Sequence, residues 1–214
     1  ERISMKQSSW EAAKLAFSIE SEDILNTLTV LDQSEFEKAV EYLAVADRIA
    51  CSGCGHSGIA CAHFAHLLCC IERPARFLSP SEAVHGGAGF LQKDDVLVVA
   101  SRGGKTEELL PIEHIAKKKG VKIIAVTENI KSPIAAGADV VLAMKVSREC
   151  DKYNCQGTTS FVVLSAIFDA LQTSLIEETG YNNEKFLVVH PGGAVGKRLK
   201  QSLEDQIVRT DLNG

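Results

Sequence analysis

The sequence predicts an α/β fold whose core is a five-stranded parallel sheet flanked by helices. Five short apolar runs, rich in Val, Ile and Ala, recur along the chain, and helical segments separate them. A strand that is apolar at nearly every position is buried on both faces, and strands of this kind that alternate with helices form parallel βαβ units. The expected strands cover residues 48–51, 75–78, 96–100, 122–126 and 140–144.

Helical periodicity accounts for the segments around the strands. Apolar residues at intervals of three and four predict three leading helices, with Ser34 and Glu37 as a capping box for the third. Pro111 is expected to kink the helix after the third strand. The expected helices cover residues 10–17, 22–31, 34–43, 57–70, 106–119, 133–137 and 157–178. No repeat or linker divides the chain, so we expect one domain over residues 1–214, in which residues 1–45 or so form a helical extension.

The composition excludes several classes of partner. The chain has 214 residues and a net charge of −5, whereas binding to nucleic acid or to an anionic membrane surface requires a basic patch. No apolar run approaches the ~20 residues of a membrane span, and the amino terminus lacks the pattern of a signal peptide. We therefore expect a cytoplasmic protein with neither nucleic-acid nor membrane partners.

Seven cysteines raise the question of a metal site. Cys51 and Cys54 form a C-x-x-C, and His63 and His66 form an H-x-x-H, so a zinc site is one interpretation. However, Cys51 ends an apolar strand, and the spacing of the two pairs matches no known finger or ribbon. An odd number of cysteines favours the other interpretation, in which they are reduced, buried thiols. We expect no metal and no cofactor.

The strand exits carry the residues that indicate binding chemistry, because ligands of open parallel sheets bind at the carboxyl ends of the strands. After the first strand, Gly55 and Ser57 belong to a G-x-G-x-S turn that opens a helix, where free backbone N–H groups favour an anion. This signal alone is weak. The turn lacks the third glycine and the acidic residue of a dinucleotide site, and the chain has no P-loop.

The exit after the third strand is a stronger candidate. Ser101 and Thr106 flank Arg102-Gly103-Gly104-Lys105, so hydroxyls, cations and a helix start come together as a phosphate cradle. In the alternative interpretation Thr106 only caps the helix, but a cap explains neither Ser101 nor the two cations. A third, longer exit passes Glu149 and ends in hydroxyls that include Ser160.

Two further segments carry a family resemblance. Residues 82–86 read EAVHG, and residues 190–199 read HPGGAVGKRL. Together with the S-x-x-G-x-T turn at 101–106, they make the chain resemble sugar isomerase (SIS) domain proteins of the KpsF/GutQ type, which include arabinose 5-phosphate isomerases. The resemblance implies a flavodoxin-like three-layer sandwich, a C-terminal HPGG tail over about residues 185–214, and a homodimer or homotetramer. Members of this type often carry a pair of CBS domains, which this chain does not reach.

The resemblance also implies roles for individual residues. Glu149 would shuttle the proton, His190 would open the ring or protonate an oxygen, and Glu108 would orient hydroxyls or share the role of base. His56 and His85 would polarise the carbonyl. The implied binding residues are Gly55, Ser57, Ser101, Gly103, Gly104, Lys105, Thr106 and Ser160.

Three positions depart from the family pattern. His56 stands where the family has lysine, Gly103 where it has serine, and Ser79 where it has a histidine proposed to contact metal. An imidazole at position 56 replaces a fixed ammonium, which bears on the preferred substrate.

The expected function is the interconversion of an aldose phosphate and a ketose phosphate through a cis-enediol. The first candidate pair is D-arabinose 5-phosphate and D-ribulose 5-phosphate. A non-catalytic sugar-phosphate sensor and an isomerase of a hexulose phosphate remain as alternatives, and the sequence does not separate the first candidate from the last.

Overall fold

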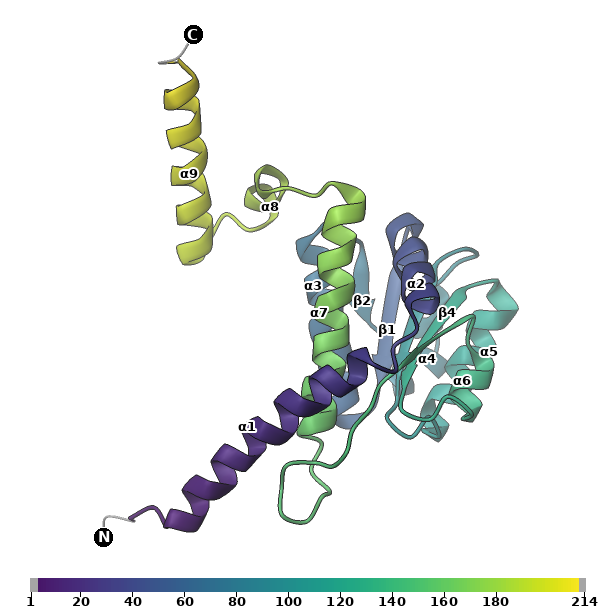
Figure 1. Ribbon diagram of the computed structural model, residues 1–214. Helices are drawn as coiled ribbons and strands as arrows, with labels where there is room; N and C mark the ends of the chain where they lie inside the picture. The colour runs from purple at the N-terminus through teal and green to yellow at the C-terminus, as the bar shows by residue number, and fades with distance from the viewer. Residues whose placement is uncertain (1–3, 212–214) are drawn as a thin grey trace.

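The computed structural model describes the backbone of residues 4–211 and the side chains of residues 4–203. Its centre is a five-stranded sheet in the order β2-β1-β3-β4-β5, in which every pairing is parallel (Figure 1). The predicted fold class is therefore confirmed, and each strand lies within two residues of its expected bounds. The strands are β1 (Ile49–Gly53), β2 (Ala75–Phe77), β3 (Val96–Ala100), β4 (Lys122–Thr127) and β5 (Val140–Ala143).

Burial on both faces holds only for the inner strands. β1 and β3 are buried at every position, and β4 is buried from its second residue on. The edge strands differ: β2 has no buried residue, and β5 alternates between buried and half-buried positions. The expectation that all five strands are buried on both faces was wrong for these two, because an edge strand has a neighbour on one side only.

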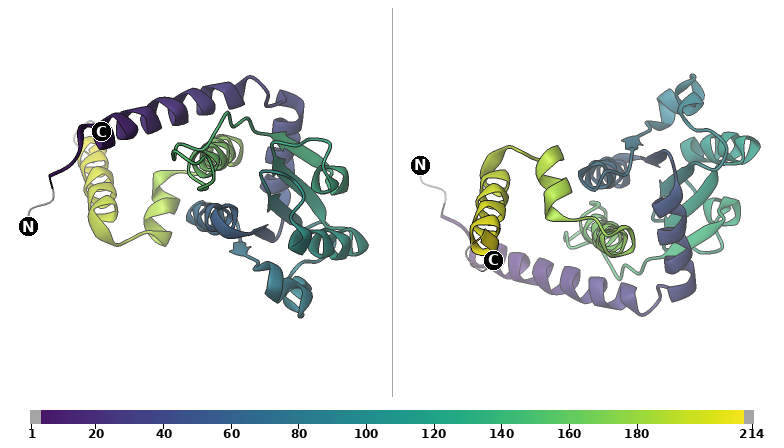
Figure 2. Two further views of the ribbon diagram at one scale, coloured as in Figure 1. Left: turned by 90° about the horizontal axis from the view of Figure 1, so that it is seen from below. Right: turned by 90° about the horizontal axis from the view of Figure 1, so that it is seen from above.

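Helices cover both faces of the sheet and make it the middle of three layers (Figure 2). Alternate residues of the strands enter separate cores: Cys51 and Val98 pack against α2, α3 and α7, whereas Ala50 and Leu97 pack against the layer of α4, α5 and α6. The helices of the first layer are α2 (Gln33–Val45), α3 (Gly55–Cys70) and α7 (Thr159–Thr179). The second layer holds α4 (Pro80–Val84), α5 (Leu110–Lys119), α6 (Pro133–Gly137) and the 3₁₀ turns η1 (Gly87–Phe90) and η2 (Glu107–Leu109).

Within the described residues, α7 alone is long and apolar enough to cross a membrane. Its apolar side chains have another explanation, since they form much of the first core. Phe168 stacks on Phe64 of α3 with ring centroids 4.3 Å apart, and Leu171 and Leu175 are fully buried. The hydrophobicity of α7 follows from its place between the sheet, α1 and α3.

The leading segment differs from the expectation of three helices. Residues 7–28 form one helix, α1 (Gln7–Leu28), because neither proline nor glycine interrupts it. The expected capping box of α2 was also wrong: Asp32 is the N-cap and accepts a hydrogen bond from the backbone N–H of Glu35 at 3.0 Å. Ser34 lies in the first turn and donates to Asp32 at 2.6 Å.

Two further differences concern α5 and the carboxyl-terminal tail. Pro111 lies in the first turn of α5, where its missing N–H costs nothing, so it does not kink the helix as expected. The residues before it form η2 instead. The tail contains two helices that the sequence analysis did not predict, α8 (Asn183–Val189) and α9 (Gly193–Asp211), which lie beyond the end of α7 (Figure 1).

A buried acid on α5 leads to a prediction about stability. Glu113 is 4% exposed, and its Oε1 has no hydrogen-bond partner among the described residues. Burial raises the pKa of this carboxyl from 4.5 to about 7, and the nearby charge of Lys117 opposes the shift. Between pH 4.5 and 7 the folded chain therefore keeps a proton that the unfolded chain releases, and stability must fall as the pH rises.

We expect the free energy of unfolding to decrease by up to about 3 kcal/mol across this interval because of Glu113. Glu113→Gln, which mimics the protonated acid, is expected to remove this decrease and to stabilise the protein at pH 8. Urea denaturation from pH 4 to 8 measures both effects, and Glu107→Gln at an exposed position serves as the control. Parallel pH curves for the wild type and Glu113→Gln would contradict the prediction.

Candidate active site

A cavity lies at the carboxyl ends of β1 and β2, and Glu108 reaches it from the segment that follows β3. From β1 the chain moves to β2 on one side and then to β3 on the other, and ligands of parallel sheets bind at such a point of reversal. A cavity of about 490 Å³ opens there. Its walls come from the turn after β1, the segment after β2 and η2, and they include Gly53, Cys54, Gly55, Gly58, Phe77, Ser79, Pro80, Ser81 and Glu108.

The turn after β1 exposes the start of α3 to this cavity. The N-cap residue Cys54 makes no side-chain hydrogen bond to the helix. The first backbone N–H groups of α3, at Gly55, His56 and Ser57, are thus not capped by it, and such groups attract anions. Ser57 is half-buried in this first turn, and its hydroxyl belongs to the same helix start.

The turn after β3 lies beside the first, because Gly53 pairs with Ala100 in the sheet. The hydroxyls of Ser101 and Thr106 are 2.8 Å apart, and the N–H of Gly104 donates to Ser101 Oγ at 3.1 Å. Thr106 makes no cap hydrogen bond, so the interpretation of this residue as a simple helix cap is wrong. The turn instead groups hydroxyls at the strand end.

Gly104 could not carry a side chain in this turn. Its φ is +65°, and a Cβ atom would lie 2.0 Å from Ser132 Oγ. The close approach to α6 therefore requires glycine here. The neighbouring Gly103 and Lys105 are exposed, so the Lys105 ammonium faces solvent at the same turn.

Glu108 is the acidic residue that lines the cavity. Its side chain is exposed, and no hydrogen bond or ion pair is found for it among the described residues. Burial and, secondly, the charge of Glu108 raise the pKa of the Cys54 thiol, which indicates that the carboxylate lies near the turn after β1. Glu108 is thus a free carboxylate opposite the start of α3.

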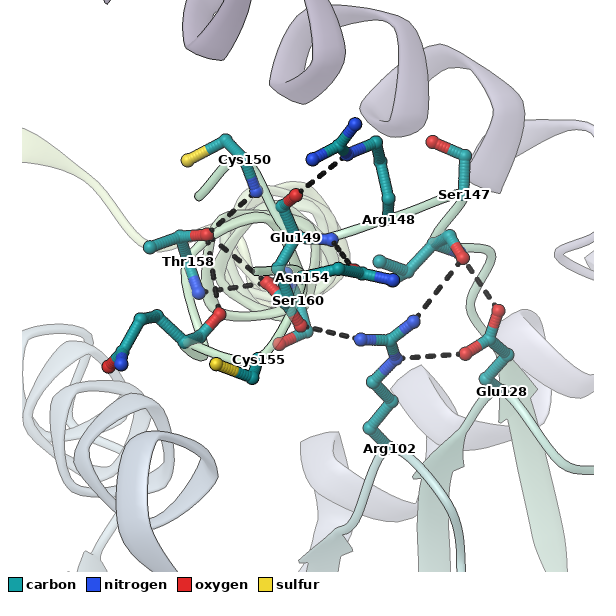
Figure 3. A network of polar contacts seen from close by, with 12 residues as sticks. Arg102, Glu128, Ser147, Arg148, Glu149, Cys150, Asn154, Cys155, Thr158 and Ser160 are labelled. Carbon is teal, nitrogen blue, oxygen red and sulfur yellow. Dashed lines mark hydrogen bonds and ion pairs between the residues drawn. The ribbon is translucent and has the colours of Figure 1, made fainter. Parts of the chain in front are cut away.

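Glu149 has a different environment, in spite of its similar expected role (Figure 3). It is 3% exposed, and its Oε1 accepts a hydrogen bond from Arg102 Nη1 at 2.6 Å. Its Oε2 accepts from the backbone N–H groups of Thr158 at 2.8 Å and Ser160 at 3.1 Å. Burial opposes ionisation, but the hydrogen bonds from Ser160 and Thr158 and the charge of Arg102 together lower the pKa. Glu149 is held as a carboxylate at the start of α7.

The guanidinium of Arg102 is paired with two carboxylates. Besides Glu149, it contacts Glu128 at 3.0 Å, so these carboxylates balance the positive charge that Arg102 brings to the turn after β3. Sequence reasoning missed Glu128. A signal was present, because Glu128 directly follows β4 and so lies at a strand exit like the other site residues.

His56, at the start of α3, contacts the loop that leads to α7, so the exit after the first strand lies against the third exit. A Cβ atom on Gly157 would lie 2.8 Å from His56 Cδ2, and the His56 ring meets that of Phe161 edge-on at 6.4 Å between centroids. Together with the pair of Arg102 and Glu149, this contact brings all three expected exits to the same end of the sheet.

The two other candidate histidines lie elsewhere. His85 is exposed at the end of α4, a helix that packs against η2. His190 follows α8, its ring stacks on Phe186 at 5.1 Å, and its Nδ1 has no hydrogen-bond partner among the described residues. Because α7 starts at the candidate site and spans about 30 Å, α8, which ends directly before His190, lies beyond the far end of this helix (Figure 1). The structure does not bring His190 to the site of its own chain.

The cysteines lie in different environments. Cys51 is fully buried in β1, where burial raises the pKa of its thiol, whereas Cys54 lines the cavity. In the described part of the chain, no three His, Cys, Asp or Glu side chains form a group that could hold a metal.

Fold and site together define an α/β protein whose cavity combines an open helix start, hydroxyls and a free carboxylate. Residues 42–174 match the SIS domain, and the chain belongs to this family. It is 36% identical over 184 residues to the arabinose 5-phosphate isomerase KdsD of Pseudomonas aeruginosa, covering 86% of this chain and 56% of that protein. It is 31% identical over 193 residues to KdsD of Francisella tularensis, covering 88% and 59%. The chain thus spans a little over half the length of these relatives.

Solved structures agree with the family assignment. A protein from Listeria monocytogenes assigned to the sugar-phosphate isomerases superimposes with a TM-score of 0.85 at 40% identity, over 89% of this chain and 100% of that one. An Escherichia coli protein in complex with arabinose 5-phosphate superimposes with a TM-score of 0.80 at 26% identity, over 87% and 100%. These comparisons confirm the resemblance to the KpsF type that the motifs indicated.

Proposed function

We propose that this chain is an aldose–ketose isomerase that interconverts D-arabinose 5-phosphate and D-ribulose 5-phosphate. The observation that carries the proposal is the free carboxylate of Glu108 in a cavity beside an uncapped helix start. To move a proton between carbons of a sugar phosphate, a protein needs at least a site that binds the phosphate and a base close to it. A relative is named arabinose 5-phosphate isomerase, and a similar solved structure contains arabinose 5-phosphate, and both favour this substrate pair.

The phosphate would be held by the two neighbouring turns. The hydroxyls of Ser101 and Thr106 already lie within hydrogen-bonding distance of each other, and the first turn of α3 adds Ser57 and backbone N–H groups. Lys105 supplies a cation that is free to move toward the phosphate. This arrangement binds the anion through local dipoles, which suits a chain of net negative charge.

The proton would move between C1 and C2 through Glu108. In the aldose-to-ketose direction the base removes the proton from C2, and the electron pair forms the cis-enediol. The protonated base exchanges its proton with solvent and then delivers a proton to C1, or back to C2 in the reverse direction. In the same conversion the hydroxyl at O2 loses its proton and O1 gains one. The geometry favours Glu108 over Glu149 as the base, because both oxygens of Glu149 already accept hydrogen bonds and its pKa is lowered. His56 and His85 remain candidates for polarising the carbonyl.

His190 would act from a neighbouring subunit of a homodimer or homotetramer. It directly follows α8, which lies beyond the far end of α7 in its own chain, and this position favours a role at a site on another copy. α1 exposes large apolar side chains, including Trp10, Phe17 and Leu25, and an apolar groove of about 180 Å³ runs between α1 and α7. A second copy would cover this surface. The proposed unit is one SIS domain, with its helical extension and HPGG tail, acting in the cytoplasm.

Hydrogen exchange on the substrate tests the proposed function. Incubated in D₂O, the wild type is expected to incorporate deuterium at C2 of D-arabinose 5-phosphate while D-ribulose 5-phosphate accumulates. NMR spectroscopy of a panel of pentose and hexose phosphates follows both changes. Exchange on a hexulose phosphate alone would indicate the related isomerase, and binding of several sugar phosphates without any exchange would indicate a sensor.

A further inference from the structure

Residues 145–147, which connect β5 to Glu149, are held by hydrogen bonds on two sides. On one side, Thr27 Oγ1 accepts from the Lys145 N–H at 3.0 Å and donates to the Lys145 carbonyl at 3.1 Å. Asp23 Oδ2 accepts from the N–H and the hydroxyl of Ser147 at 2.7 and 2.9 Å. Residues 145 and 147 of the segment are therefore both bound to α1.

The residue between them faces the opposite side. The Val146 N–H donates to Glu128 Oε1 at 3.2 Å, and the Val146 carbonyl accepts from Arg102 Nη2 at 3.5 Å. The segment thus continues the direction of β5 with alternating partners, although no strand lies on either side. Arg102 also holds Glu149 and pairs with Glu128, so the contacts of Val146 and the candidate site share Arg102.

Asp23 and Thr27 are unusual within α1. They are 1% and 4% exposed, and they are the two buried residues of a helix whose other side chains are exposed or half-buried. Their spacing of four residues places them on one face. Buried polar groups stabilise a fold only when they are hydrogen-bonded, because a buried group that loses its partner is not hydrated in exchange. Here the hydrogen-bond partners belong to residues 145 and 147, far along the chain.

We propose that Asp23 and Thr27 are positioning residues that fix the loop of residues 145–158 and thereby Glu149 and Arg102. This proposal rests on the proposed isomerase function. α1 lies before the residues that match the SIS domain, which begin at residue 42. The helical extension therefore supports the site in addition to any role in subunit contacts.

The latch formed by Asp23 and Thr27 acts directly on the third exit, and it reaches the turn after β3 only through Arg102, which contacts Val146 and Glu149. Ser147 is two residues before Glu149, whose N–H is in turn fixed by Asn154 Oδ1 at 2.7 Å. Without its anchors on α1, the loop would shift Glu149 relative to the start of α7. The phosphate turns and the start of α3 have no contact with the latch among the described residues. His56, a candidate for polarising the carbonyl, contacts Gly157 of this loop. Turnover should therefore depend on the latch, whereas binding of the phosphate by the hydroxyls of Ser101 and Thr106 should not.

The test compares two substitutions of the same residue. Thr27→Val keeps the shape of the side chain and removes both hydrogen bonds to Lys145, whereas Thr27→Ser retains the hydroxyl. We expect Thr27→Val to lower kcat about tenfold, with an unchanged dissociation constant for D-arabinose 5-phosphate. Amide hydrogen exchange over residues 145–158 should become about tenfold faster, while the strands keep their protection. Thr27→Ser should restore both values.

Asp23→Ala provides a second variant, and Glu22→Gln on the exposed side of the same helix turn serves as the control. Unchanged exchange in residues 145–158 for Thr27→Val and Asp23→Ala would overturn the proposal. So would a uniform increase over the whole chain, which would indicate a merely structural role. If the wild type converts no sugar phosphate, the proposed function fails, and the exchange measurement still decides whether α1 holds the loop.

Discussion

Replacing Glu108 by glutamine is expected to lower kcat about a thousandfold, because an amide cannot take the proton from C2. The side chain is exposed and has no hydrogen bond among the described residues, so the melting temperature should stay unchanged. Glutamine also has nearly the same size, and sugar-phosphate binding by calorimetry should persist. Deuterium incorporation at C2 measures the loss directly.

Glu149→Gln is the matched comparison. It is expected to lower both turnover and the melting temperature, since the amide leaves Arg102 without its buried partner and accepts fewer hydrogen bonds at the start of α7. An active Glu108→Gln together with an inactive, fully stable Glu149→Gln would reverse the assignment and make Glu149 the base.

Two inactive variants are expected to regain activity when they share one oligomer. His190→Ala alone should lower kcat about a hundredfold or more. If His190 serves the neighbouring site, a dimer of one His190→Ala chain and one Glu108→Gln chain contains one site with both native residues. Random association of equal amounts then restores about a quarter of the wild-type activity, and the purified mixed dimer has about half.

Co-expression of the two variants with different affinity tags yields the mixed oligomer for the assay. The separately purified variants, mixed just before measurement, serve as the control for slow subunit exchange. Absence of recovery in purified mixed oligomers would show that His190 does not act across the subunit contact. If light scattering shows a monomer and this monomer is fully active in the assay, the proposed homo-oligomer is wrong.

Local sequence patterns were sufficient for most of the fold. Strands such as β3 are apolar at every position, and this feature depends on nothing beyond the strand itself. The turns at Gly55 and Ser101 could be placed at the active edge for the same reason, since a strand followed by a helix start always ends at the carboxyl edge of a parallel sheet. The break expected inside α1 failed because polar residues in its middle resembled a boundary, although nothing there stops a helix.

The partners of the charged residues could not be predicted in this way. Nothing near Arg102 in the sequence indicates that it binds Glu128 and Glu149, which are 26 and 47 positions away. The same holds for Asp23, whose partner Ser147 lies 124 positions along the chain. Such pairs form only when strand order and helix packing bring distant segments together.

The sequence by itself thus determined the α/β class, the strands, the glycine and hydroxyl turns and the family motifs, because each depends on residues close together in the chain. The tertiary structure decided which carboxylate is free and which is held. Glu108 and Glu149 are both plausible bases in the sequence, but the side chain of one lines a cavity, whereas the other is buried beneath Arg102 and the start of α7. Burial and hydrogen bonding set the protonation and availability of a carboxyl group, and both are properties of the folded chain.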